Sequence, residues 1–185
     1  MMLTFSPVMG NPTTPLPWAD PCGDSLAAVT EDPWDGVPTP SPVPISETMK
    51  VLGNLSVRVK DSTQHMMSLY VSKRFMDPTY PENLEGFNLA GMPNVITSAE
   101  NIAFYSSKPV SESLVDAYRN LSLAAVHMEQ VRLDEITKEY GEFKTEVETI
   151  EKKLYSLMCN IDLELRHQEV VLGRHVTRDV MSVEY

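Results

Sequence analysis

The amino-acid sequence predicts an all-α protein, in which three long helices follow a proline-rich segment. Apolar residues recur every three or four positions in three separate stretches, as they do on one face of a helix. Prolines fall before and between these stretches and not within them. No stretch alternates apolar and polar residues in the way that predicts a half-buried strand. Together these observations favour a bundle of helices.

The composition excludes several classes of protein. A chain of 185 residues is long enough for one domain with a sizeable core. Its formal net charge is −11 and its isoelectric point is about 4.7, so it lacks the basic surface that binds nucleic acid or anionic membranes. No window of about 20 apolar residues predicts a transmembrane helix. The first residues hold many prolines and no basic region, so we expect no signal peptide.

The cysteines and histidines predict neither a metal site nor a cofactor. Cys22 and Cys159 lie far apart in the sequence, and we expect two free thiols. The histidines show no paired-ligand spacing; Glu164 and His167 make one Glu-x-x-His pair, and a single pair does not define a metal site. The glutamates of the third apolar stretch have no nucleophile, base or glycine-rich loop beside them. We therefore expect no enzyme activity.

Residues 1–44 form a proline-rich arm ahead of the helices. The arm holds 10 of the 14 prolines, a composition that suits neither a helix interior nor a central strand. We predict that it is flexible. Trp18 and Trp34 are either docking anchors or isolated aromatic residues in this arm, and the composition favours the second interpretation.

The helical region is predicted to cover residues 45–172, with helices at about 45–74, 111–138 and 142–172. Gly141 is the expected break between the second and third helices, and Gly173 is the expected cap at the end of the third. The first apolar stripe consists of Ile45, Met49, Leu52, Leu55, Val59, Met66 and Tyr70. The second consists of Leu114, Ala117, Tyr118, Leu121, Ala125 and Met128. The third consists of Phe143, Val147, Ile150, Leu154, Leu157, Ile161 and Leu165.

The lengths of the connections predict the directions of the helices. Only a few residues join the second and third helices, so these two should be antiparallel. About 36 residues join the first and second, enough to run back along a first helix about 42 Å long. The prediction is up, up, down, as at the beginning of an up-up-down-down bundle. Residues 173–185 form a short tail without an apolar stripe long enough for a fourth helix.

Several short motifs, taken in order, resemble ciliary neurotrophic factor and its cardiotrophin relatives among the interleukin-6-type helical cytokines. The first helix ends with "SLYV", and the long connection contains "LAGMP". The second helix carries "LVDAYRNL", and the third opens with "GEFKTEVETI", in which Gly141 and Phe143 occupy the family's positions. The resemblance covers about residues 45–171. It implies the long-chain up-up-down-down cytokine fold, truncated here to three helices.

The resemblance also implies a function and partners. Members of the family act outside the cell, bind class I cytokine receptor ectodomains and trigger kinase-linked signalling. The expected partners are the shared signal-transducing receptor chain, the leukaemia inhibitory factor receptor and an alpha receptor. The family's contacts to the last two involve the fourth helix, for which no position here matches. The absence of the fourth helix reflects either truncation or a genuine three-helix variant. Without that helix, signalling would be impaired or antagonistic. We also expect self-association, because without a fourth helix the three apolar stripes would leave apolar surface exposed to solvent.

Outward residues of the first and third helices are the candidate receptor-binding residues, since the family binds the shared chain with these helices. They are Arg58, Lys60, Asp61, Gln64, His65, Glu148, Lys152, Tyr155 and Leu163. Glu148 and Lys152 are spaced as a favourable pair. Tyr155, Cys159 and Leu163, here called the outward patch, are unusually apolar for an outward face. The alternative for this patch is that the arm or a second copy covers it.

A second interpretation of the chain is an intracellular adaptor whose helices dock onto helices of other proteins. The two interpretations differ in location. The cytokine acts outside the cell and, without a recognisable signal peptide, also has a cytoplasmic pool. The adaptor has cytosolic partners only.

Overall fold

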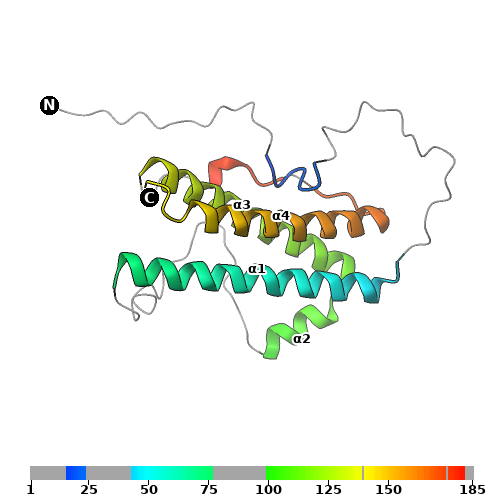
Figure 1. Ribbon diagram of the computed structural model, residues 1–185. Coiled ribbons are helices and arrows are strands. Elements are labelled where there is room, and N and C mark those ends of the chain that lie inside the picture. The colour runs from blue at the N-terminus through cyan, green and yellow to red at the C-terminus, as the bar shows by residue number, and fades with distance from the viewer. Residues whose placement is uncertain (1–15, 24–42, 77–98, 139, 174, 182–185) are drawn as a thin grey trace.

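The computed structural model describes residues 16–23, 43–76, 99–138, 140–173 and 175–181. Its helices are α1 (Ile45–Arg74), α2 (Ala99–Ser107), α3 (Val110–Thr137) and α4 (Lys144–His167), followed by the short 3-10 helix η3 (Arg178–Met181) (Figure 1). The described residues contain no strand, so the all-α prediction is confirmed. The "LAGMP" motif, Trp34 and most of the arm lie outside the described residues.

The predicted bounds agree with α1 and α3 to within a residue, but two elements differ. The third predicted helix was expected to reach residue 172, and α4 ends at His167. Glu169 adopts a left-handed conformation with φ of 57°, and the Val170 N–H donates to the Leu165 carbonyl at 2.9 Å. This is the 6→1 bond of a Schellman cap, which ends the helix without the expected Gly173. Helix α2 was not predicted.

The helix directions follow from contacts between α4 and its two neighbours. On α1, Ser62 bonds to Lys153, whereas the later Arg74 lies 3.3 Å from the earlier Glu142. On α3, Arg132 bonds to Glu151, and later residues again meet earlier residues of α4. Helices α1 and α3 are therefore both antiparallel to α4 and parallel to each other, as Figure 1 shows. The predicted order up, up, down is confirmed for these three helices.

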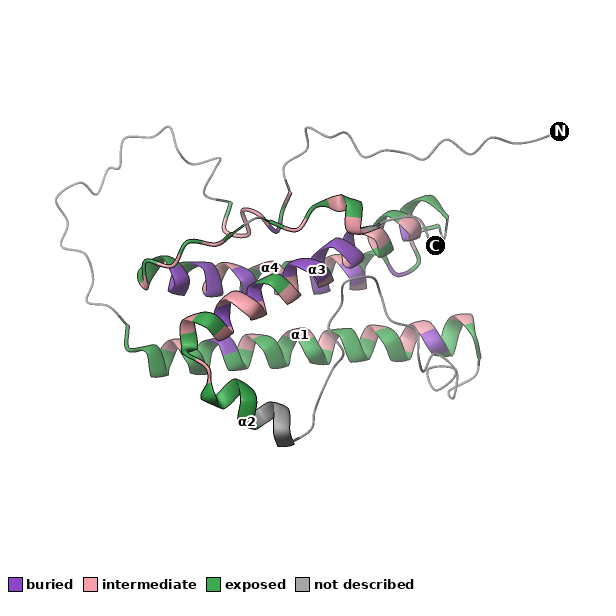
Figure 2. Cartoon of the chain, turned by 180° about the vertical axis from the view of Figure 1, so that it is seen from behind, coloured by how far each residue is buried: buried purple, intermediate pink, exposed green. Residues whose placement is uncertain are grey.

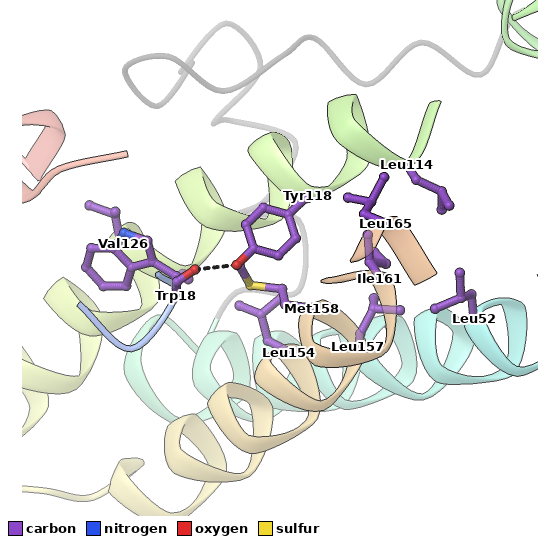
Figure 3. Packing of buried hydrophobic residues seen from close by; sticks show 11 residues of the cluster. Trp18, Leu52, Leu114, Tyr118, Val126, Leu154, Leu157, Met158, Ile161 and Leu165 are labelled. Carbon is purple, nitrogen blue, oxygen red and sulfur yellow. Dashed lines mark hydrogen bonds between the residues drawn. The ribbon is translucent and has the colours of Figure 1, made fainter. Parts of the chain in front are cut away.

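The hydrophobic core lies along α4, which contributes more buried residues to it than any other element (Figure 3). All seven residues of the predicted third stripe are buried. Helix α3 adds Leu114, Tyr118, Ala125 and Val126, whereas α1 adds Leu52 alone. Trp18, from the arm, completes the cluster. The clean periodicity of the third stripe thus marked the helix at the centre of the fold.

Helix α1 is bound to the bundle along one narrow edge. Only Leu52 and Val71 are buried among its 30 residues, and Figure 2 shows most of the helix exposed. Met49 keeps 43% of its surface exposed and Met67 51%. Such exposed apolar surface favours association. Self-association nevertheless stays a prediction, because only a single copy of the chain is present.

We expect the free energy of unfolding to depend far more on α4 than on the stripe of α1. Leu154→Ala removes a side chain that is 2% exposed and should cost about 2–5 kcal/mol, because it leaves a cavity between three elements. Met49→Ala is the matched control and should cost less than about 1 kcal/mol. Urea unfolding followed by circular dichroism measures both. Equal losses would contradict the central position of α4.

Candidate functional site

A polar groove of about 470 Å³ runs between α1 and α4 and is the candidate binding site. Helix α1 lines it with Arg58, Asp61, Ser62 and His65. Helix α4 lines it with Thr145, Glu146, Thr149 and Lys153. On each helix these residues are spaced three or four positions apart, which places them on one side of the helix. The groove therefore combines the flanks of the two antiparallel helices.

The polar and charged side chains of the groove differ in how far they are exposed to solvent. Arg58, Asp61 and His65 are exposed, whereas Lys153 is half-buried and donates its ammonium group to the Ser62 hydroxyl. The Ser62 hydroxyl in turn donates to the Arg58 carbonyl at 2.9 Å. This chain of bonds ties α4 to a full turn of α1. The result is a mixed surface, in which cationic and anionic side chains alternate over a fixed backbone.

Next to the groove, aromatic and charged side chains join the end of α1 to the start of α4. Phe143 is 1% exposed, and its ring centroid lies 5.2 Å from that of Tyr70. Lys73 and Arg74 lie over the Phe143 ring, at 5.2 and 5.5 Å, and both also pair with Glu142. Cations over an aromatic ring are attracted to its negative face. The junction fixes the register of α1 against α4 and hence the two walls of the groove.

The start of α4 is anchored to α3 as well. The Glu135 carboxylate is buried and accepts a hydrogen bond from the Phe143 N–H at 3.0 Å. This N–H stands at the beginning of the helix, where it has no partner within α4. Glu135, on α3, therefore caps the N-terminus of α4. The start of α4 is therefore held by α1 and by α3.

The structure brings together only part of the predicted receptor-binding set. Arg58, Asp61 and His65 line the groove, whereas Lys60 and Gln64 are exposed on α1 outside its lining. On α4, Lys152 is exposed and Glu148 is half-buried. The Glu148 carboxylate pairs with the Lys144 ammonium, one turn earlier, at 3.7 Å and not with the expected Lys152.

The outward patch is divided. Leu163 is 51% exposed, as expected. Tyr155 is half-buried against the core cluster, and this burial raises the pKa of its phenol. Cys159 forms a disulfide with Cys22, with the two Cα atoms 4.9 Å apart. The prediction of two free thiols is therefore wrong, and the alternative that the arm covers this patch holds for Cys159.

Trp18 anchors the arm in the core. Its ring is fully buried, its indole N–H donates to the Val176 carbonyl at 2.7 Å, and its own carbonyl accepts the Tyr118 hydroxyl at 2.7 Å (Figure 3). Arg178 lies over the ring at 5.5 Å from its centroid. The interpretation of Trp18 as an isolated aromatic residue in a flexible arm is wrong. Burial of so large a ring offsets part of the cost of ordering residues 16–23.

The tail is held to the bundle by a buried charge network. The Arg178 guanidinium donates two bonds to the Glu129 carboxylate, at 2.7 and 2.9 Å. Arg132 lies between Glu129 and Glu151, at 3.8 and 3.1 Å. Burial is the largest influence on Glu151 and raises the pKa of its carboxyl, with Arg132 acting in the opposite direction. These pairs attach residues 175–181 of the tail to α3.

Sequence reasoning missed Glu146, Thr149 and Lys153, because it considered only the face of α4 opposite the core. Their spacing of three and four residues was the available signal. It also missed the disulfide and the Arg178–Glu129 pair. These join residues far apart in the chain, and no local pattern reveals such pairs.

Among the described residues no group of three or more His, Cys, Asp or Glu side chains is arranged to hold a metal ion. None of the described helices is long and apolar enough to cross a bilayer. The groove offers an open, mixed-charge surface on two rigid helices, which suits contact with another macromolecule.

Comparisons with known protein families, with characterised proteins and with solved structures find no match.

Stability should depend on pH through Glu151. A carboxyl whose pKa is raised by folding stabilises the native state below its ordinary value of 4.5, and this contribution is lost as the pH rises through the raised value. Glu151→Gln should therefore flatten the decline in unfolding free energy above pH 4.5. Urea titrations between acid and neutral pH measure this slope. Glu47→Gln, at an exposed site on α1, is the control and should keep the decline. Parallel profiles for Glu151→Gln and the unsubstituted protein would contradict the assignment.

Proposed function

We propose that this chain is a helical cytokine of the ciliary neurotrophic factor and cardiotrophin type. It binds class I cytokine receptor ectodomains and triggers kinase-linked signalling. The observation that supports this most is the direction of the helices. Parallel α1 and α3, both antiparallel to α4, are the arrangement expected for the first three helices of a long-chain up-up-down-down bundle.

The disulfide supports a place of action outside the cell. Disulfides persist in oxidising compartments and are rare where glutathione and thioredoxin keep thiols reduced. The Cys22–Cys159 bond joins two segments that are 137 residues apart in sequence. In the chain-entropy account, closing a loop of that length contributes up to about 5 kcal/mol. A chain that gains this much from oxidation is suited to the extracellular space.

The groove between α1 and α4 is the proposed contact for the shared signal-transducing receptor chain. On one wall Arg58 and Asp61 provide exposed charges and His65 an exposed imidazole, and on the other wall Lys153 and Glu146 provide half-buried charges. Such mixed charges set the orientation and speed of association more than its strength. Leu163, Glu148 and Lys152 extend the accessible surface of α4. Among the predicted receptor-binding residues of α4, Tyr155 contributes least to this contact, because its side chain is already half-buried in the bundle.

Contacts to the leukaemia inhibitory factor receptor and to an alpha receptor belong to the family's fourth helix. We propose these two receptors as further partners, and the groove between α1 and α4 as the contact for the shared chain.

The alternative is an intracellular adaptor that docks through α1. The observation that favours it is the exposure of Met49, Val51, Val57 and Met67 on this helix. Exposed apolar side chains on a helix are what a partner helix packs against. The disulfide favours the cytokine, because the cytosol would keep Cys22 and Cys159 reduced.

Binding of the purified chain to the ectodomain of the shared receptor chain tests the proposal. Surface plasmon resonance should show a dissociation constant in the micromolar range or below. Arg58→Glu places a negative charge beside Asp61 in the groove and should weaken binding about tenfold, equivalent to about 1.4 kcal/mol.

Arg119→Glu is the matched control for this substitution. Arg119 is exposed on α3, outside the groove, so its reversal should leave the dissociation constant within about twofold. Absence of detectable binding by the unsubstituted chain would overturn the cytokine proposal. Equal effects of the two reversals would move the contact away from the groove.

A further inference from the structure

We infer that the Cys22–Cys159 disulfide is a redox latch. It holds the arm segment, residues 16–23, on the α3–α4 face, and the arm segment in turn holds residues 175–181 of the tail. Reduction by a dithiol releases both segments and uncovers apolar surface on α3 and α4, while the three long helices stay packed. This inference concerns the regulation of one face of the molecule and does not depend on which partner the groove binds.

Besides the disulfide, the arm segment is attached to the bundle mainly through Trp18 and through Leu16, which packs against the core cluster. Its two backbone hydrogen bonds, from Ala19 to Leu16 and from Gly23 to Asp20, lie within the segment itself. Toward the bundle, the hydrogen bonds described above are those of Trp18 with Val176 and Tyr118. Eight residues must be ordered for these contacts, at about 1–2 kcal/mol each for the backbone alone. The covalent bond is what keeps Trp18 near its pocket at high effective concentration.

The tail rests on the arm segment. The Val176 carbonyl accepts the Trp18 indole N–H, and the Arg178 guanidinium covers the Trp18 ring. When Trp18 leaves, this carbonyl loses its partner and the guanidinium loses the ring beneath it. The Arg178–Glu129 bonds then face more water, which weakens a charged pair. Release of the arm segment therefore loosens residues 175–181 as well.

The surface under Trp18 is apolar. Figure 3 places Trp18 beside Val126 and near Met158, both of which are fully buried. Tyr118 is 3% exposed and holds the Trp18 carbonyl. Removing the indole opens this part of the core cluster to solvent. A newly exposed apolar patch of this kind tends to associate with other apolar surfaces.

The rest of the core does not require the arm segment. Leu52, Leu157 and Ile161 form the contact between α1 and α4 at a distance from Trp18 (Figure 3). Leu114 and Leu165 join α3 to α4 at the same end. The Phe143 junction holds the opposite end of α4. These contacts remain when the latch opens, so we expect helicity to persist.

The exchange chemistry is accessible, because Cys22 and Cys159 are each only partly buried. A thiolate of a dithiol reagent attacks one of the two sulfur atoms and forms a mixed disulfide, while the other sulfur leaves as a thiolate and takes up a proton. The second thiol of the reagent then attacks the mixed disulfide, closes the oxidised reagent into a ring and releases the remaining cysteine thiol. Two electrons and two protons pass from the reagent to the protein.

The test uses the full chain with Trp34→Phe, so that Trp18 is the sole tryptophan. Dithiothreitol should shift the Trp18 emission to the red and remove the hydrogen-exchange protection of residues 16–23 and 175–181. Far-ultraviolet circular dichroism and the protection of α4 should stay unchanged. The Cys22→Ser, Cys159→Ser double variant is the control and should show the released state with and without reductant.

Three results would overturn the latch. Thiol titration of the purified chain without reductant could find two reactive cysteines, meaning that the disulfide does not form. Reduction could leave the Trp18 emission and the protection of the arm segment unchanged, meaning that noncovalent contacts suffice. Reduction could also unfold the helices together with the arm, meaning that the bond supports the whole fold and not one face.

Discussion

The structure depends on α4 being packed on several sides at once. Ten of its 24 residues are buried, whereas α1 buries two of 30. Helix α4 therefore stands between α1 and α3 and also carries the arm on a further side. Because both neighbours are antiparallel to it, they must be parallel to each other. The directions of the helices, the groove and the position of the arm all follow from this one constraint.

The groove and the latch lie on different sides of α4. Thr149 and Lys153 face α1, whereas Tyr155 and Cys159 lie toward the arm and tail. Figure 1 shows α1 on one side of the bundle and the arm segment with η3 on the other. A change at the arm therefore need not disturb the groove. One helix can present a constant surface for recognition and a second surface that depends on the redox state.

The sequence predicted most of the helical framework, because helix formation and amphipathic packing follow local patterns. The third stripe, from Phe143 to Leu165, is buried throughout, and α1 has the predicted ends. Local patterns failed where long-range contacts decide. Glu169 ends α4 in a left-handed conformation although Gly173 was available, and Trp18 is buried by elements more than 90 residues away. The Cys22–Cys159 bond was missed for the same reason. The α4 wall of the groove did have a local signal in its residue spacing, and it was missed because only the face opposite the core was considered.

Distances between spin labels test the parallel arrangement of α1 and α3 most directly. Labels at Lys50 near the start of α1 and at Glu112 near the start of α3 should lie at the same end of the bundle. A label at Lys138, just beyond the end of α3, should lie about 40 Å farther along the bundle axis, since α3 rises about 1.5 Å per residue. Double electron–electron resonance should therefore give a much shorter distance for residues 50 and 112 than for residues 50 and 138. The reverse order would show α1 and α3 to be antiparallel and would contradict the account.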